Sequence, residues 1–520
     1  MKNRLIKIAI FATMTIAAVV LTFSIRGNPG SPSADELNNP EWKENGPFEL
    51  SPERGRFTLL YSIIEDNSLS FSLPLARFTT PDLGYIDGKY VSLFAPAVSF
   101  LAMPGYLIGR AFGASQFGSF VTSALFALGN VYLIYLIAIR LGSSKIAGLL
   151  GGLTFVFATP GFAYAVNLYQ HHISTFIILM SSYLAISYTS WFSLAMIWLL
   201  ALTSLSVDYP NLVIMVPIAI YCLHKLVEVK HEGKLVIKLH FGKWLSVVGA
   251  VLPLLFFFWF NNASYGNPLQ FSGTVQSVSK IDELGLPAID LSQAEDNVQA
   301  VIDAEKQEDK TALGFFKSRS MLNGLYILLF SEDRGLLIFA PVLLFALLGM
   351  LVGFKKHAKE TVLFCSIITV NILLYSMWGD PWGGWAFGAR YLIPSYAILA
   401  IFIALALSKW KKNWAYLLIY LVLVIYSSYI NTAGALGSSA NPPKVKVLQL
   451  EKITGRQEKY TYERNLDMLR LNTSKSFFYR AFAKQYMSSW QYFQVVYGTV
   501  VLLFVVLLTS LYLSHRGNKS

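Results

Sequence analysis

Cysteine and charge are the two scarce components of this 520-residue chain. Its two cysteines, Cys222 and Cys365, fall in or beside apolar runs, which argues against a disulfide framework and against a cysteine-based metal site. Charged residues make up 14% of the chain, whereas soluble proteins carry about 25%. This scarcity excludes an ordinary soluble domain. The 54% hydrophobic content and the mean hydropathy of +0.50 indicate a membrane protein.

The net charge of +12 would suggest a nucleic-acid partner if the chain were soluble. Here the lysines and arginines are concentrated in short loops between apolar runs, where basic residues orient membrane helices. The membrane is therefore the expected partner, and nucleic acid is not.

Apolar runs of membrane-crossing length predict about twelve transmembrane helices. The runs are 8–25, 117–139, 146–165, 173–190, 192–207, 211–227, 244–261, 335–354, 361–378, 391–408, 414–430 and 492–514. Basic residues gather in alternate loops, so the positive-inside rule predicts a multi-pass cell-membrane protein with both termini in the cytoplasm. The first run is longer than a signal-peptide core and lacks a clean cleavage site, so we expect it to remain as the first span.

This topology places three long segments outside the cell, residues 27–116, 262–334 and 431–491. Residues 94–112 are apolar but carry prolines, and counting them as a span would reverse every later loop, so we expect an interfacial helix there. In the second segment, LSQAEDNVQAVIDAEKQEDK predicts a solvated helix. In the third, NPPKVKVLQLEKITGRQEKYTYERN predicts short strands or loops.

Three regions follow from this pattern. Residues 1–430 form a transmembrane region that includes the first two outer loops. Residues 431–491 form an extracytoplasmic loop region, and residues 492–520 form the last transmembrane helix and a cytoplasmic tail. The expected fold class is an all-α polytopic membrane protein, with juxtamembrane helices in the first extracytoplasmic loop and small outer α/β loop regions.

Glu53 is the candidate catalytic residue because it lies in the outer segment richest in ionisable groups. It follows Ser51 and Pro52, which place proline in the first turn of a helix, so one interpretation is a carboxylate that stabilises a helix N-terminus. The other is a general base, which must face a cavity outside the bilayer and have cations nearby that keep it ionised. Arg54 and Arg56 supply such cations.

His171 and His172 are the histidines that this topology places outside, at the mouth of a pair of helices. They are either an interfacial polar cap or groups that bind a metal ion or a phosphate. Two imidazoles alone leave the cofactor unknown, a divalent metal ion included. Asp208, in SVDYPN, is either a helix cap or a group that points into the same outer cavity as Glu53.

Arg334 and Arg390 lie at the outer surface, against the positive-inside bias. They are expected either to bind an anion, or to reach lipid headgroups or pair with Asp333 and Asp380. The tryptophan-rich run 379–388 near Arg390 is either an interfacial aromatic belt or a platform for a sugar ring and a polyprenyl tail.

Several blocks occur in an order that resembles the GT-C superfamily of polytopic glycosyltransferases, which includes the protein O-mannosyltransferases and the aminoarabinose transferases. The blocks are ERGRFTLLYSIIEDNSL, YIDGKYVSLFAPAVSFLAMPGY, SVDYP, NNASYGNPLQ, LLFSEDRGLLIFAPVLL and WGDPWGGWAFGARYLIP. The resemblance covers most of the membrane region and implies a GT-C-like fold.

In that superfamily a carboxylate early in the first outer loop acts as the catalytic base, often within Asp-Glu-x-Arg-Tyr. Aligning Arg56-Phe57 with Arg-Tyr puts Glu53 on the catalytic position, with Arg54 in place of the second acid. Where many relatives carry a Lys-Pro-Pro run, this chain has Leu93-Phe94-Ala95-Pro96, which shifts the expected phosphate contacts to other cations. Those expected donor-phosphate ligands are Arg56, Lys89, Arg334 and Arg390. The residues expected in the substrate cavity are Asp87, Tyr90, His171, His172, Asp208 and Trp385.

The resemblance implies transfer of a sugar, with inversion, from a polyprenyl-phosphate-linked donor to an extracytoplasmic lipid, glycan or protein acceptor. Two alternatives stay open. A transporter or flippase would place ionisable groups or broken helices at mid-membrane, whereas the apolar runs here are almost free of charge. A ligase or polymerase that joins preassembled glycans would share the lipid-phosphate site and need a larger outer groove.

Overall fold

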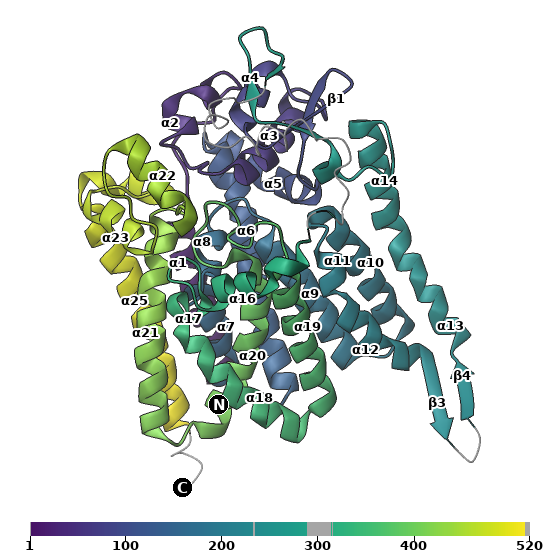
Figure 1. The fold of residues 1–520 in the computed structure, drawn as a ribbon. Helices are drawn as coiled ribbons and strands as arrows, with labels where there is room; N and C mark the ends of the chain where they lie inside the picture. The colour runs from purple at the N-terminus through teal and green to yellow at the C-terminus, as the bar shows by residue number, and fades with distance from the viewer. Residues whose placement is uncertain (1, 232–234, 289–313, 315, 515–520) are drawn as a thin grey trace.

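The computed structural model describes residues 2–231, 235–288, 314 and 316–514. Long helices stand side by side below a cap of shorter elements, and both chain ends lie on the side away from the cap (Figure 1). Six of the described helices are long and apolar enough to cross a membrane: α6 Ser115–Arg140, Gly242–Tyr265 (with α14 Val251–Tyr265), α19 Ala358–Ser376, Arg390–Trp410 (with α20 Ile393–Trp410), α21 Trp414–Leu436 and α25 Ser489–Leu513.

Shorter apolar helices complete the bundle. They are Ile8–Ser24 within α1 Lys2–Ser24, α7 Lys145–Phe157, α9 His171–Ser187, α10 Trp191–Val207 and α12 Val216–Leu226. The helix α18 Phe345–Lys356 has 12 residues. All of the predicted apolar runs therefore coincide with helices, and the chain is an all-α polytopic membrane protein. The count of about twelve spans stays a prediction.

Proline explains why some of these runs are not single helices. The run 146–165 divides into α7 and α8 Gly161–Ala165 at Pro160, and the run 335–354 divides at Pro341, between α17 Leu336–Phe339 and α18. Proline lacks the amide hydrogen that a helix interior needs, and its ring clashes with the preceding turn.

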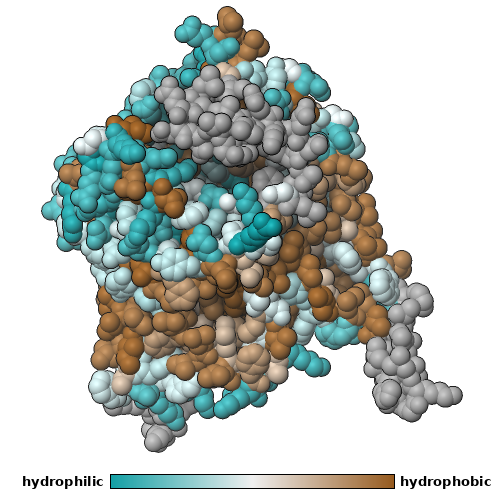
Figure 2. Space-filling view, viewed as in Figure 1, coloured by the Kyte–Doolittle hydropathy of each residue, from teal (hydrophilic) through white to brown (hydrophobic). Residues whose placement is uncertain are grey.

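The surface of the bundle agrees with burial in lipid. Figure 2 shows a hydrophobic belt over the long helices, with hydrophilic residues above and below it. Exposed apolar side chains on the long helices include Leu252 of α14, Val422 of α21 and Leu502 of α25, which are exposed by 70%, 57% and 62%. A contiguous apolar surface of this kind is costly in water and is the expected lipid-facing surface of a membrane protein.

Glycine allows α5 Ala97–Ala111 to lie directly against α6. A Cβ atom on Gly118 would be 2.1 Å from the Gly105 carbonyl oxygen and 2.8 Å from the Gly109 Cα atom. Small residues at such contacts let two helix backbones approach closely. The helix that we expected over 94–112 is thus present, seated on the outer half of the bundle (Figure 1).

Gly118→Ala is expected to destabilise the protein by about 1–3 kcal/mol, because the added methyl group overpacks a backbone contact. Thermal unfolding of the detergent-purified protein measures the effect. Gly498→Ala in α25 is the matched control, since a Cβ atom there meets no atom of the described chain within 4 Å. Equal unfolding temperatures for the two variants would contradict the close α5–α6 contact.

The cap is built from all three long outer segments. The first contributes η1 Glu36–Asn38, α2 Pro40–Lys43, α3 Ser51–Glu65, α4 Leu73–Thr79 and the antiparallel hairpin β1 Leu83–Ile86 and β2 Lys89–Ser92. The second adds β5 Gln276–Val278, which pairs antiparallel with β1, and the small hairpin β6 Lys280–Ile281 and β7 Pro287–Ala288. The third contributes α22 Lys444–Thr454, α23 Glu463–Arg470 and α24 Phe477–Ala481.

One local prediction in the third segment is wrong. Residues 444–454 were expected as short strands or loops, and they form helix α22, which ends at Gly455 in the left-handed region (φ +66°). The Lys, Gln and Glu residues of this stretch favour a helix, and glycine is the preferred residue after a helix end. The polar helix expected within 291–310 lies outside the described residues.

Candidate active site

A cavity of about 1060 Å³ separates the first outer segment from the last one. One wall is the start of α3, on both sides of Glu53. The second wall is the turn that contains Trp378, Asp380, Trp385 and Arg390, and the third is the loop region around α22 to α24. Residues that are hundreds of positions apart in the sequence thus face one space.

Glu53 lies directly behind the first wall and is fully buried. Its Oε2 atom accepts a hydrogen bond of 2.8 Å from the Glu49 amide, and its Oε1 atom has no partner among the described residues. Burial is the largest influence and raises the pKa of Glu53 to about 7. Glu49 adds to this rise and Arg26 opposes it. The carboxyl group is therefore close to half ionised at neutral pH.

The expected helix start at Glu53 is present as well, because α3 begins at Ser51 and has Pro52 in its first turn. A carboxylate that only stabilises a helix N-terminus has no need of deep burial, since this interaction also operates at exposed surfaces. The buried, half-satisfied carboxyl group is therefore the feature that a capping role leaves unexplained.

Sequence reasoning missed the residues that hold Glu53 in place. Arg26, at the end of α1, is buried and donates to Glu49 Oε2 at 2.5 Å and to Ser439 Oγ at 2.9 Å. Glu49 Oε2 also accepts from the Ser439 amide at 2.6 Å. Burial opposes ionisation, but Arg26 and Lys475 lower the pKa of Glu49 to about 2. Glu49 thus joins the first outer segment to the last, and its amide orients Glu53.

Arg390 and Arg56 meet around the ring of Tyr169. The Arg390 guanidinium lies 5.4 Å from the Tyr169 ring and 5.4 Å from the Tyr391 ring, and Arg56 lies 5.9 Å from Tyr169 and 4.9 Å from Phe94. Nε and Nη1 of Arg390 have no hydrogen-bond partner within the described chain, and neither does Nε of Arg56. Such unpartnered buried donors are costly, so they mark a place where an anion would be stabilised.

His171 and Asp208 belong to the same cluster. The His171 ring stacks on Tyr169 at 5.6 Å, and Asp208 accepts a hydrogen bond of 3.0 Å from Gln170. Burial raises the pKa of Asp208, while Gln170, Arg56 and Arg390 oppose that rise. Asp208 caps no helix with its side chain, because α11 Asn211–Ile214 starts after Pro210 and shows no side-chain cap.

His172 points the other way, into the bundle. Its Nε2 atom is 2.7 Å from the Gly161 carbonyl oxygen, and its main-chain oxygen accepts from Asn130. The ring is fully buried and packs against Phe155 at 5.5 Å. The histidine pair is therefore divided between the cluster and the core.

Three predicted site residues lie on the β1–β2 hairpin. Asp87 and Lys89 are exposed at its turn, and the Tyr90 hydroxyl donates to the Gly285 carbonyl at 2.8 Å. None of the three is among the residues that line the cavity.

Arg334 is fully buried, and its guanidinium is occupied by the backbone. It donates to the carbonyl oxygens of Trp382 (3.1 Å), Asp333 (2.9 Å), Gly384 (3.1 Å) and Asn441 (2.8 Å). These bonds join three chain segments beside the cavity. They satisfy the buried Arg334 guanidinium, so its presence here does not require a bound anion. The Asp380 carboxylate, for its part, accepts from the Gly384 amide at 2.5 Å.

Trp385 does line the cavity, and the Arg464 guanidinium lies 5.9 Å from its ring. With Trp378 and Tyr391 it forms an aromatic wall beside Arg390. As for a metal ion, no group of three or more His, Cys, Asp or Glu side chains in the part of the chain that the structure covers could hold one.

Glu53→Gln is expected to stabilise the protein at alkaline pH and not at acidic pH. The pKa is raised from 4.5 to about 7 in the folded state, so between these values the folded protein keeps a proton that the unfolded chain releases. Stability therefore falls as pH rises through this range, by about 3 kcal/mol in total for this group. Glutamine imitates the protonated form and avoids the loss.

Unfolding temperatures of both proteins at pH 4.5 and pH 8 measure this effect. The difference in favour of Glu53→Gln should be small at pH 4.5 and large at pH 8. Glu283→Gln, at an exposed position of the same cap, serves as the control and should show the same small difference at both pH values. If the difference for Glu53→Gln did not depend on pH, Glu53 would not be a buried carboxyl group with a raised pKa.

Solved structures similar to this chain are membrane enzymes. ArnT from Cupriavidus metallidurans matches at 9% identity and a TM-score of 0.43 in the apo state, covering 98% of this chain and 76% of that one. Bound to undecaprenyl phosphate it matches at 11% identity and a TM-score of 0.47, covering 98% and 78%. The oligosaccharyltransferase AglB from Archaeoglobus fulgidus, in complex with an inhibitory peptide and a dolichol-phosphate, matches at 12% identity and a TM-score of 0.41, covering 95% and 56%.

ArnT and AglB are GT-C membrane glycosyltransferases, the superfamily that the sequence resembles. Neither a protein-family model nor a curated protein sequence matches the chain.

Proposed function

We propose that this protein is a membrane glycosyltransferase that transfers a sugar from a polyprenyl-phosphate-linked donor to an extracytoplasmic acceptor, with inversion. The observation that carries the proposal is one large cavity lined by Arg390 and by Pro52 and Arg54, the two neighbours of the buried Glu53. Among the described residues, one oxygen of Glu53 and two nitrogens of Arg390 have no hydrogen-bond partner. A carboxyl group and a cation with free bonding capacity are the two groups that this reaction needs.

Glu53 is the proposed general base. As an acceptor hydroxyl attacks the anomeric carbon, its proton moves to Glu53, a new C–O bond forms, and the bond between the anomeric carbon and the phosphate oxygen breaks. A pKa of about 7 suits this step, because a base works best when its pKa is near the operating pH. The Glu49 amide keeps one carboxyl oxygen in place and leaves the other for the acceptor.

Arg390 is the proposed ligand of the donor phosphate, which leaves with an additional negative charge. Its Nε and Nη1 atoms have no hydrogen-bond partner among the described residues, and the Tyr169 and Tyr391 rings hold the guanidinium in position. Arg56 lies deeper in the same cluster, and we propose that it supports the charge there. Lys89 and Arg334 have no part in this proposal, since one lies on the exposed hairpin turn and the other is occupied by backbone oxygens.

The position of the cluster favours an enzyme over a transporter. The four residues of the cluster stand at helix ends and not at helix middles: Glu53 in the first turn of α3, His171 at the start of α9, Asp208 directly after α10 and Arg390 directly before α20. A transporter would bind its substrate near mid-membrane. Because both termini lie on the side opposite the cap, we propose a cytoplasmic location for the termini and an extracytoplasmic one for the cavity.

The test is a transfer assay. The detergent-purified protein is incubated with a radiolabelled polyprenyl-phosphate hexose and an extract of cell-envelope lipids and glycans, and label that enters the acceptor fraction is counted. We expect protein-dependent transfer and release of polyprenyl phosphate. If a panel of hexose and pentose donors gives no transfer to lipid, glycan or protein fractions, the proposal is wrong.

A further inference from the structure

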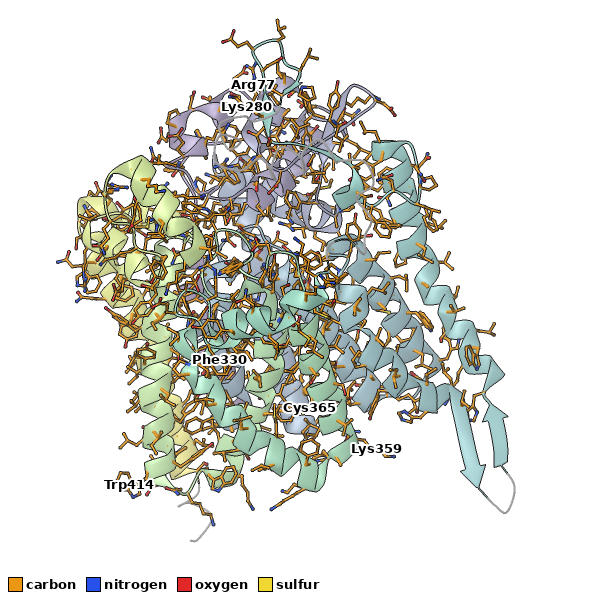
Figure 3. The ribbon with its side chains drawn as sticks, in the orientation of Figure 1. Arg77, Lys280, Phe330, Lys359, Cys365 and Trp414 are labelled. Carbon is orange, nitrogen blue, oxygen red and sulfur yellow. The ribbon has the colours of Figure 1, made fainter. Side chains whose placement is uncertain are left out.

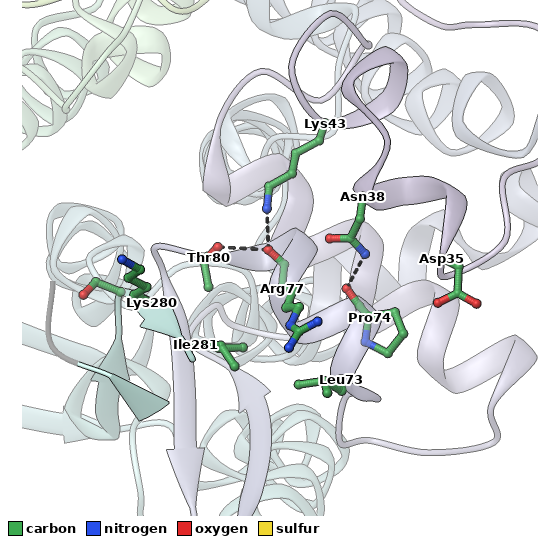
Figure 4. Close-up of a pocket in the computed structure, with 10 residues that line it drawn as sticks. Asp35, Asn38, Lys43, Leu73, Pro74, Arg77, Thr80, Lys280 and Ile281 are labelled. Carbon is green, nitrogen blue, oxygen red and sulfur yellow. Dashed lines mark hydrogen bonds between the residues drawn. The ribbon is translucent and has the colours of Figure 1, made fainter. Parts of the chain in front are cut away.

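A second hollow lies on the outer face of the cap, beside the large cavity. It measures about 470 Å³ and is lined by η1, α2 and α4 from the first outer segment and by β6 from the second one. Figure 4 shows the Arg77 guanidinium between Leu73 and Ile281, with Lys280 to one side and Asp35 on the opposite side. Two outer segments are thus needed to form it.

Positive charge dominates this hollow. Lys43, Arg77 and Lys280 face one carboxylate, Asp35, and no ion pair joins any of these cations to another described residue. Lys43 donates to the Arg77 carbonyl oxygen at 2.7 Å, and Arg77 donates to the Asp282 carbonyl at 3.1 Å. These hydrogen bonds fix the positions of two of the cations, and no carboxylate among the described residues forms an ion pair with any of the three.

The pKa of Lys43 agrees with a positive potential in the hollow. Burial lowers the pKa of the Lys43 ammonium, Arg54 and Arg77 lower it further, and Glu44 opposes them. An anion in the hollow would remove this repulsion. Leu73, Pro74 and Ile281 add an apolar surface against which the C–H face of a sugar ring can pack, and Asn38 and Thr80 add polar groups.

The hollow adjoins the proposed active site. Lys43 and Thr80 line the hollow, whereas the next residues in the chain, Glu44 and Pro81, line the large cavity. Arg54, in the wall of the large cavity, donates to the Lys43 carbonyl at 2.7 Å. A chain-like ligand that leaves the large cavity over this ridge would enter the hollow next.

We propose that the hollow is a distal acceptor subsite, which binds an anionic sugar unit of an extended acceptor glycan while the acceptor's reacting hydroxyl lies near Glu53. This inference rests on the proposed glycosyltransferase function and adds that the acceptor is a negatively charged saccharide chain. The negative group is a carboxylate or a phosphate, since lysine and arginine bind both.

A lipid headgroup of the surrounding membrane does not fit this position. Arg77 and Lys280 lie at the top of the cap in Figure 3, whereas the hydrophobic belt in Figure 2 covers the long helices well below them. A soluble or protruding glycan reaches the top of the cap, and the headgroups of the bilayer do not.

Binding of pentasaccharides to the detergent-purified full-length protein, without donor, tests the inference. The probes are penta-galacturonic acid, which carries carboxylates, mannopentaose phosphate, and neutral mannopentaose. Isothermal titration should show that one or both anionic probes bind at least fivefold more tightly than mannopentaose at low salt, with the difference reduced at high salt. Equal affinities for all three probes would overturn the proposal.

Variants locate the site. Lys280→Glu, at an exposed position, should weaken binding of the anionic probe by about fivefold or more, since it reverses one charge. Lys43→Gln, which keeps a donor for the Arg77 carbonyl, should weaken it as well. Lys452→Glu makes the same charge change on an exposed position of α22 outside the hollow and should leave the affinity within twofold. An equal loss in Lys452→Glu and Lys280→Glu would show a general charge effect and overturn the subsite.

The two proposals fail in different ways. Binding is measured without donor, so absence of sugar transfer would leave a selective, Lys280-dependent affinity for anionic pentasaccharides intact. In contrast, transfer that depends on Glu53 together with equal affinities for the three probes would remove the subsite and leave the proposed reaction in place.

Discussion

Glu53→Gln is expected to lower the rate of sugar transfer by about 10²–10⁴-fold, the range over which a positioned general base accelerates a reaction. Glutamine has nearly the same size and can still accept the hydrogen bond from the Glu49 amide, so the local structure should persist. It cannot take a proton from the acceptor. The loss should therefore appear in kcat, with little change in the KM for the lipid donor.

The pH profile provides a second readout of the same base. Because the pKa of Glu53 is raised to about 7, the ionised fraction and the transfer rate should increase as pH rises through 7 and then level off. The residual activity of Glu53→Gln should lack this dependence. Glu49→Gln removes a neighbouring negative charge that raises the pKa of Glu53, so its profile should shift to lower pH, provided that Arg26 keeps its place.

Glu36→Gln is the matched control, because Glu36 is an exposed carboxylate of the same outer segment that binds Ser33 and lies outside both cavities. It should transfer sugar at the unchanged rate. If Glu53→Gln retained more than half of the activity, the base would have to be another residue, and Asp208 would be the next candidate in the cluster.

The helical framework was predictable because membrane helices leave a local signal. An apolar run of span length can satisfy its backbone hydrogen bonds only as a helix in lipid, so the runs 117–139 and 414–430 identify α6 and α21 without any knowledge of their neighbours. Prolines within longer runs also show where helices break, as at Pro160 and Pro341.

The site residues were predictable only where their sequence neighbours identify them. Glu53 and Arg56 stand one turn apart on α3, and Arg390 breaks the charge bias of its loop, so both features are visible in the sequence. The Arg26–Glu49–Ser439 contact joins residues separated by 413 positions along the chain. Pairing over such a distance is set by tertiary packing, and composition or periodicity carries no trace of it.

The residues of the β1–β2 hairpin show the converse case, in which the sequence suggests site residues that the fold places away from the cavity. Asp87 and Lys89 are charged, close in sequence to Glu53, and lie within a block that resembles a known family. Their placement is decided by pairing of β1 with β2 and β5, which turns them outward at the hairpin end. The residue types within one segment do not show how its strands pair with a strand from another outer segment.

Arg390→Gln is expected to lower kcat/KM for the lipid donor by about 10²–10³-fold, the loss usual for one donor that stabilises charge in a transition state. The physical reason is that Arg390 lines the cavity and that two of its guanidinium nitrogens have no hydrogen-bond partner in the described structure, so they can stabilise the departing phosphate. Arg390→Lys keeps the charge and loses the two-pronged geometry, so it should recover part of the loss. Transfer measured over a range of donor concentrations separates binding from rate.

Two further variants distinguish catalysis from folding. Arg319→Gln, at an exposed outer position away from the cavity, should leave both activity and unfolding temperature unchanged. Arg334→Gln should lower the unfolding temperature, because four backbone oxygens lose their donor in a buried place. Arg390→Gln should lose activity at an unchanged unfolding temperature. If instead it behaved like Arg334→Gln, with instability accounting for the lost transfer, Arg390 would be a structural residue and the phosphate would need a different ligand.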